Sequence, residues 1–256
     1  MLTASNARVK QLRRLSRRSE RSERRLFLAE GRNAVEAAID AGAVLEVFAQ
    51  PYRDHLLPPI PDGVPLTFVD ERALKALSDS VSPAGVVALC RFMDVPVEQA
   101  LVGGYVAICA DVSDPGNAGT VIRCADAAGA GGVVLAGKSV DLYNGKTVRA
   151  SAGSAFHLPI ATGAAAADAV RAAQASGYTV LATDARGEVD LFEADEILAR
   201  PTAWLLGNEA HGLSPDVAGL ADHRVRIPIH GRAESLNLST AAALCLYASA
   251  RVQHRH

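Results

Sequence analysis

The stretch YVAICADVSDPGNAGTVIRCADAAGAGGVVLAG, residues 105–137, decides the fold class of this chain. Its two ends, residues 105–112 and 131–137, are apolar runs with the length and composition of buried strands. The segment between them has the pattern of a helix, so the chain passes from strand to helix to strand. Apolar strands that alternate with helices predict a parallel sheet covered by helices on both faces.

The same alternation continues to the C-terminus. Helical patterns occupy residues 165–177 and the segment from Asn237 onward. The sequence therefore predicts an α/β fold with a mostly parallel sheet, in which ligands bind beyond the carboxyl ends of the strands. The further predicted strands are HLPIA (157–161), YTVLATDA (178–185), AWLLGNE (203–209) and RVRIPI (224–229).

The N-terminal part has the pattern of a second, smaller α/β unit. Residues 7–92 alternate between helical and strand patterns and begin with a basic helix. The segment DVPVEQALVGG, residues 94–104, has the Pro, Gly and polar content of a linker. We therefore predict two domains, residues 1–96 and residues 104–256.

The composition is that of a globular protein. With 256 residues, of which 49% are hydrophobic and 21% charged, the chain can bury a full core. No apolar run approaches the ~20 residues that span a bilayer, and the first residues lack the apolar core of a secretory signal, so we expect no membrane association and a cytoplasmic location. The cysteines are widely spaced, which predicts neither disulfides nor a metal site.

Charge is distributed unevenly along the chain. Residues 1–36 contain ten Lys and Arg against four Glu, a net charge of +6, although the whole chain carries −2. Such an excess at one end predicts a basic face that binds a polyanion such as nucleic acid. The alternative is an amphipathic helix whose arginines only face water while Leu12, Leu15 and Leu26 pack.

Residues 132–139, GVVLAGKS, match the phosphate-binding pattern G-x-x-x-x-G-K-[ST]. In a P-loop the four variable residues form a loop that runs straight into a helix. Here these residues are Val, Val, Leu and Ala, which have the composition of a buried strand. The sequence therefore disfavours an ATPase and assigns the glycines to packing and turns, while the roles of Lys138 and Ser139 stay open.

Three predicted strand ends carry an unusual density of polar and small residues. Each follows an apolar run and leads into a turn or a helix start. Taken singly, each polar residue has a simpler explanation as a helix cap, a surface charge or a solvated loop acid. The three segments are DVSDPGNAGTVIRCADAAGA (111–130), LLGNEAHGLS (205–214) and RIPIHGRAESLNLSTAAALCLY (226–247).

Together and in this order, the three segments resemble motifs one, two and three of the SpoU (TrmH-like) branch of the SPOUT RNA methyltransferases. The resemblance covers residues 105–256. The N-terminal part is similar to the L30e-like RNA-binding domain of many members, including the thiostrepton-resistance rRNA methyltransferases. The resemblance implies a knotted C-terminal domain, a homodimer, and S-adenosylmethionine-dependent methylation of a ribose 2′-hydroxyl in RNA.

The resemblance also implies the site residues. Arg123 matches the catalytic arginine of motif one, but a guanidinium has no acceptor and is a poor general base. We therefore interpret its role as holding a phosphate and stabilising charge on the 2′-oxygen. Glu209 is expected to brace Arg123 or the motif-two loop. The implied catalytic residues are Asn117, Arg123, Glu209, Ser235 and Asn237, and the implied cofactor-binding residues are Thr183, Gly207, Asn208, Ile227 and Leu236.

The sequence also bears on the choice of RNA substrate and on the alternative functions. The N-terminal domain favours rRNA over tRNA, because RNA recognition targets folded loops. A tRNA methyltransferase, an RNA-binding protein without catalysis and a metabolic nucleotide-binding enzyme remain as alternatives, and the lack of a G-x-G-x-x-G pattern disfavours the last.

The sequence also predicts residues that contact RNA or a second subunit. RNA contacts are expected from Arg8, Lys10, Arg13, Arg14 and Arg149. Dimer contacts are expected from Leu238, Ala242, Cys245, Leu246 and Ala250.

Overall fold

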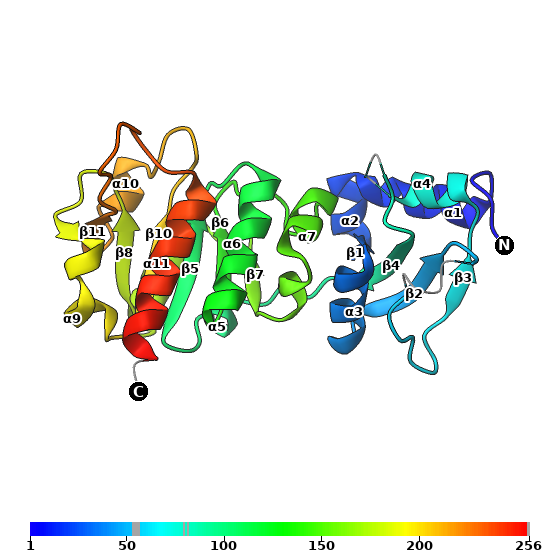
Figure 1. Ribbon diagram of the computed structural model, residues 1–256, viewed down its shortest axis with the longest axis horizontal. Coiled ribbons are helices and arrows are strands. Elements are labelled where there is room, and N and C mark those ends of the chain that lie inside the picture. The colour runs from blue at the N-terminus through cyan, green and yellow to red at the C-terminus, as the bar shows by residue number, and fades with distance from the viewer. Residues whose placement is uncertain (53–56, 79, 81, 255–256) are drawn as a thin grey trace. The chain divides into compact units, whose positions relative to one another are not determined.

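The computed structural model describes residues 1–52, 57–78, 80 and 82–254 (Figure 1). The chain forms two compact units. Unit 1 contains Met1–Met93 and Asp141–His157, and unit 2 contains Asp94–Val140 and Leu158–His256. Within the described part of the chain, no helix is both long and apolar enough to cross a membrane.

Unit 2 is built on a seven-stranded sheet of order β7-β6-β5-β10-β8-β11-β9, in which every strand pair is parallel. Every residue of β5 and β10 is buried, because these strands lie inside the sheet with helices on both faces. The predicted α/β fold class is confirmed, while the knot that the resemblance implies stays a prediction. The strands are β5 (Tyr105–Ala110), β6 (Val133–Ala136), β7 (Ile160–Thr162), β8 (Thr179–Thr183), β9 (Val189–Asp190), β10 (Thr202–Leu206) and β11 (His223–Arg226).

Helices cover both faces of this sheet. On one face, Ala169 and Ala173 of α8 pack in a core cluster with Ile108. On the other face, α6 and α11 lie side by side (Figure 1), and Trp204 donates a hydrogen bond from Nε1 to Oγ of Ser249 at 2.9 Å. The helices are α5 (Val97–Ala100), α6 (Pro115–Ala128), α8 (Ala166–Ala175), α9 (Asp195–Leu198), α10 (Pro215–Ala218) and α11 (Leu238–Gln253).

The last helix begins where the sequence predicts, with Asn237 as its N-cap. Its apolar residues behave differently from the prediction. Ala242, Cys245 and Leu246 were expected to face a second subunit, but they are fully buried within this chain. Helix α11 packs against α6, β5 and β10, and this contact already covers them. The prediction of a dimer contact was therefore wrong for these three residues.

Unit 1 contains a four-stranded sheet of order β1-β4-β2-β3, in which β4 is antiparallel to β1 and β2, and β3 is parallel to β2. Leu12, Leu15 and Leu74 pack with Phe48 in the core cluster of this unit. The predicted basic helix is divided into α1, a short 3-10 turn and α2, because the backbone of Arg17 is extended. The elements are α1 (Ala7–Arg13), α2 (Arg18–Arg24), β1 (Leu26–Glu30), α3 (Arg32–Asp40), β2 (Val44–Ala49), β3 (Leu66–Phe68), α4 (Glu71–Leu77), β4 (Val86–Arg91) and α7 (Gly145–Ser151).

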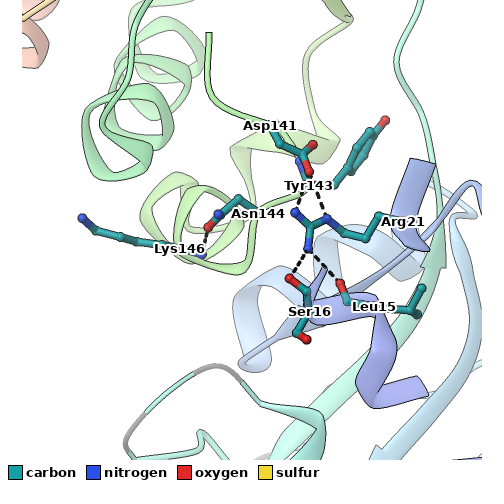
Figure 2. Close-up of polar contacts among 7 residues, drawn as sticks. All are labelled: Leu15, Ser16, Arg21, Asp141, Tyr143, Asn144 and Lys146. Atoms are coloured by element: carbon teal, nitrogen blue, oxygen red, sulfur yellow. Dashed lines mark hydrogen bonds and ion pairs between the residues drawn. The ribbon is translucent and has the colours of Figure 1, made fainter. Parts of the chain in front are cut away.

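Residues 141–157, which include α7, belong to unit 1 although they follow β6 of unit 2 in the chain. Figure 2 shows the buried guanidinium of Arg21 pointing at the carboxylate of Asp141, with donor–acceptor distances of 3.0 and 2.6 Å. The same guanidinium donates to the backbone carbonyls of Leu15 and Ser16 at 2.8 Å. The predicted domains, residues 1–96 and 104–256, stay a prediction. The two compact units differ from them mainly in residues 141–157.

The P-loop-like segment is a strand followed by a turn. Its variable residues form β6, as the sequence predicts. A Cβ at Gly132 would meet the carbonyl oxygen of Ala100 at 2.2 Å, so this glycine allows close packing. The buried hydroxyl of Ser139 accepts from the backbone of Val112 at 3.0 Å and lies 2.7 Å from the carbonyl oxygen of Ala136. Ser139 therefore anchors the backbone at the ends of β5 and β6.

Candidate active site

Unit 2 contains a cavity of about 540 Å³ beyond the carboxyl ends of β8, β10 and β11. Its volume lies within the ~300–1,000 Å³ of small-molecule sites. The position follows from the topology, because all three strands are parallel and their ends meet at one edge of the sheet. The lining residues are Thr183, Asp184, Ala185, Gly207, Asn208, Glu209, Ala210, Gly212, Val225, Ile227, Ile229, Ser235, Leu236, Asn237, Leu238 and Ala241.

Most of the predicted site residues lie at this cavity. The lining includes all five residues predicted to bind the cofactor and three of the five predicted to be catalytic, namely Glu209, Ser235 and Asn237. Asn117 lies outside the lining but is hydrogen-bonded to Glu209 and Asn237. Arg123 is not in the lining, and its side chain forms no hydrogen bond with another described residue.

Gly207 follows β10 and begins a tight loop. A Cβ at this position would meet the backbone carbon of Gly212 and the backbone nitrogen of Leu213, both at 2.5 Å. Two backbone hydrogen bonds between Asn208 and Gly212, of 3.0 and 2.9 Å, close the loop. A side chain at Gly207 would force the loop open, so only glycine allows this shape.

The side chain of Asn208 fixes the same loop to the end of β5. Its Nδ2 donates to the backbone carbonyl of Asp111 at 2.7 Å, and its Oδ1 accepts from the backbone of Ala210 at 2.8 Å. Asp111 has a φ of 57°, a conformation that few residues other than glycine adopt. Asn208 therefore stabilises two strand-end loops at once, as well as lining the cavity.

The carboxylate of Glu209 holds the loop that precedes α6. Oε2 accepts from the backbone N–H and the hydroxyl of Ser113, both at 3.0 Å, and Oε1 accepts from the backbone of Asp114 at 3.0 Å and from Nδ2 of Asn117 at 3.1 Å. Desolvation of the carboxylate raises its pKa, but the hydrogen bonds outweigh this effect, so the pKa of Glu209 lies below its ordinary value. Glu209 is thus ionised at neutral pH and bonded to motif one, and no hydrogen bond or ion pair joins it to Arg123 among the described residues.

Asn117 joins the starts of two helices. The N-cap of α6 is Asp114, whose side chain accepts from the backbone of Asn117 at 2.8 Å, so the side chain of Asn117 is free for other bonds. Its Oδ1 accepts from Nδ2 of Asn237 at 3.0 Å. Asn237 also caps α11 by accepting from the backbone of Ser239 at 2.9 Å. The three predicted motifs therefore meet at one hydrogen-bonded network.

Arg123 lies on the solvent-exposed side of α6. Ala127, one turn further along α6, is also exposed, and its carbonyl accepts from the hydroxyl of Tyr247 on α11 at 3.4 Å. Leu244 and Tyr247 are exposed large apolar residues of α11, at 38% and 52%. An exposed surface that carries Arg123 therefore continues from α6 onto α11.

Several lining residues were not predicted. Asp184 follows Thr183 at the end of β8, and this position at a strand end could have predicted Asp184 as a lining residue. Ile229 lies two residues after Ile227, and period-two alternation could have identified it. The remaining unpredicted residues are small or apolar and give no polar signal: Ala185, Ala210, Gly212, Val225, Leu238 and Ala241.

The residues predicted to bind RNA all lie in unit 1. Lys10 and Arg13 are exposed. Arg8 forms an ion pair with Glu46 at 3.0 Å, Arg14 forms one with Glu20, and Arg149 forms one with Glu30 at 3.2 Å. Their side chains keep exposures of 45%, 57% and 32%, respectively. RNA contact by these residues stays a prediction.

Comparison with known proteins decides the family. The model of the SpoU rRNA methylase family matches residues 104–247, and the model of the MRM3-like substrate-binding domain matches residues 6–88. The chain belongs to the SpoU rRNA methylase family. The predicted family and enzyme class are therefore confirmed.

Relatives of this SpoU methylase match it over nearly its whole length. The 23S rRNA (guanosine(2553)-2'-O)-methyltransferase RlmP of Bacillus subtilis is 31% identical over 96% of both chains. An AdoMet-bound rRNA methyltransferase of Sinorhizobium meliloti is 34% identical, with a TM-score of 0.85 over 98% of this chain and 97% of that one. The SpoU methyltransferase AviRb of Streptomyces viridochromogenes, solved with AdoMet, is 32% identical, with a TM-score of 0.83 over 96% and 97%.

Proposed function

We propose that this chain transfers the methyl group of S-adenosylmethionine to a ribose 2′-hydroxyl of ribosomal RNA. The observation that carries the proposal is the meeting of all three motifs in one hydrogen-bonded network of Glu209, Asn117 and Asn237, in which Glu209 and Asn237 also line the cavity. The proposal is supported by the relatives, which are named as 23S rRNA 2'-O-methyltransferases or were solved with AdoMet.

The cavity fits this cofactor by the chemistry of its lining. Ile227, Leu236 and Val225 offer apolar walls to an adenine ring, and the loop at Gly207 and Asn208 offers backbone groups to its polar edge. The cofactor supplies a methyl group activated by the positive charge of its sulfonium. The residues around it then have to exclude water and align the 2′-oxygen, because orientation supplies much of the rate.

The network residues and Arg123 have different roles in this proposal. Asn117, Glu209 and Asn237 fix the loops that shape the reaction site, and Ser235 adds a hydroxyl to the lining. Arg123 binds a phosphate of the RNA and stabilises charge that develops on the 2′-oxygen. Its exposure leaves the guanidinium accessible to RNA.

Unit 1 binds the substrate RNA in this proposal. Its N-terminal segment exposes Lys10 and Arg13, and Arg8, Arg14 and Arg149 retain exposed side chains. The match to a substrate-binding domain over residues 6–88 supports this assignment. Positive side chains of this kind bind phosphates and release counterions, which gives affinity without base specificity.

The enzyme acts as a cytoplasmic homodimer in this proposal, with an interface on the exposed surface of α6 and α11. Leu244 and Tyr247 supply apolar area there beside Arg123 and Ala127. Sedimentation of the wild type as a dimer, and of a variant with Leu244→Glu and Tyr247→Glu as a folded monomer, would support the interface. A wild type that stays monomeric at micromolar concentration would contradict it.

Transfer of tritium from methyl-labelled cofactor tests the function. We expect label in protein-free 23S rRNA or in ribosomal subunits, and none in tRNA. Alkaline hydrolysis should leave the label in an alkali-resistant dinucleotide, because a 2′-O-methyl group blocks cleavage of the adjacent phosphodiester and a base methyl group does not. Label in tRNA alone would favour the tRNA alternative, and cofactor binding without transfer to any RNA would contradict the proposal.

A further inference from the structure

The cavity lining has an uneven charge. Its charged residues are Asp184 and Glu209, and it contains no Lys or Arg among the described residues. Both carboxylates lie on loops at the carboxyl ends of parallel strands, β8 and β10. A cavity with negative groups and no positive group favours a cationic ligand over a neutral ligand of the same shape.

The two carboxylates differ in how much of their hydrogen-bonding capacity is used. Glu209 accepts four hydrogen bonds, three from the loop before α6 and one from Asn117 in the first turn of α6, which use both of its oxygens. Asp184 accepts one, from the backbone of Arg186 to Oδ1 at 2.8 Å. Its Oδ2 accepts no hydrogen bond from another described residue. Asp184 is therefore the lining carboxylate with an oxygen available to a ligand.

The backbone holds Asp184 in place at the end of β8. Its N–H donates to the carbonyl of Val225 on β11 at 3.0 Å, and its carbonyl accepts from the backbone of Gly187 at 3.0 Å. The side-chain bond to Arg186 closes a turn of the kind that aspartate commonly forms. Because the backbone and one oxygen are fixed, the second oxygen keeps a defined position in the lining without a ligand.

We propose that Asp184 recognises the positive charge of the cofactor and makes the cavity prefer S-adenosylmethionine over S-adenosylhomocysteine. This inference rests on the proposed function. The two molecules share the adenosine, the amino group and the carboxylate, but the first has a cationic sulfonium and the second a neutral thioether. Transfer of the methyl group therefore removes the positive charge that the carboxylate attracts, and the product binds less tightly than the cofactor it replaces.

Calorimetry with purified full-length protein tests this inference, using S-adenosylmethionine and S-adenosylhomocysteine as separate probes. Asp184→Asn keeps Oδ1 as the acceptor for Arg186 and removes only the charge. We expect the Kd of S-adenosylmethionine to rise about fivefold in this variant, the scale of one partly screened charge pair, and the Kd of the product to change less than about twofold. Asp216→Asn is the matched control, because Asp216 is exposed on α10 outside the lining.

The salt dependence of the two Kd values, measured with the wild-type protein, gives a second test that needs no variant. The ratio of the two Kd values should move toward one as salt rises from about 0.05 to 1 M, because ions screen the attraction between carboxylate and sulfonium. Equal weakening of both probes in Asp184→Asn, or a ratio that does not depend on salt, would overturn the inference while the proposed function stands. A wild type that binds neither probe would overturn the proposed function and this inference with it.

Discussion

Asn237 donates its side-chain amide to the side-chain carbonyl of Asn117 at 3.0 Å, across 120 positions of the sequence. The bond joins the N-cap of α11 to the first turn of α6. Since Asn117 also donates to Glu209, one side chain connects the second and third motifs. The side chain of Asn117 can form both bonds because Asp114, and not Asn117, caps α6.

Replacement of Asn117 should reduce catalysis more than stability. Asn117→Ala removes the bonds to Glu209 and Asn237 but leaves the Asp114 cap. We expect single-turnover methyl transfer to fall about tenfold, the effect of ~1.4 kcal/mol, while Tm changes by a few degrees at most. Thr120→Ala on the same helix is the control, because the side chain of Thr120 bonds to Gly116 of its own helix and to no other described residue. Equal rates in the two variants would contradict this role.

The ionised carboxylate of Glu209 should stabilise unit 2 at neutral pH, and this stabilisation should be lost in acid. Its hydrogen bonds lower the pKa in the folded state, so the ionised form contributes stability above the unfolded pKa, and this is lost as pH falls through the lower folded value. Glu209→Gln removes the ionisable group, so its thermal stability should lie below that of the wild type at pH 7 and approach it in acid. Thermal scans from about pH 7 down to pH 3 check this, and parallel curves for the two proteins would contradict it.

Arg123 should affect the chemical step and not cofactor binding. Arg123→Ala should lose roughly 10²-fold or more in single-turnover methyl transfer, the scale for one preorganised electrostatic donor. Arg123→Lys should recover little, because an ammonium does not reproduce the planar fork of guanidinium at a phosphate. The Kd of the cofactor should stay unchanged, since Arg123 lies outside the cavity lining. Arg171→Ala, at an exposed ion pair on α8, is the control, and a rate for Arg123→Ala equal to that control would exclude a catalytic role.

The exposed arginines of the N-terminal segment should bind RNA through charge alone. Replacement by Glu should weaken RNA binding and flatten its salt dependence, because fewer counterions are released, while the Kd of the cofactor stays the same. Binding titrations at several salt concentrations measure both effects, and an unchanged salt slope would assign these arginines to a solvated surface. The residues to reverse are Arg13, Arg14, Arg17 and Arg18, all exposed.

Arg21, in the same segment, should stabilise the fold and not bind RNA. It is buried and ion-paired with Asp141, so Arg21→Ala should lower the free energy of unfolding by about 3 kcal/mol, because it leaves the partly buried carboxylate of Asp141 unpaired. Arg18→Ala, on the exposed surface of the same helix, should change it by less than about 0.5 kcal/mol. Urea unfolding separates the two, and equal stabilities would contradict the structural role of Arg21.

Local sequence patterns determined much of this protein. The apolar runs of β5, β6, β8, β10 and β11 and the helices between them follow from periodicity, because strands and helices present side chains at different repeats. A parallel sheet then follows, and its carboxyl edge places Thr183, Gly207 and Ile227 at one cavity. The composition of residues 132–139 likewise indicated a strand and not a phosphate loop.

Only the tertiary structure decided which distant groups pair. Glu209 bonds to the loop before α6 and not to Arg123. Arg21 bonds to Asp141 and is buried, unlike the exposed arginines of the N-terminal segment. Ala242, Cys245 and Leu246 on α11 are buried inside the chain, although the same apolar pattern would suit a subunit interface. Periodicity shows that a face is apolar or that a charge needs a partner, but the partner is chosen by packing between segments far apart in the sequence.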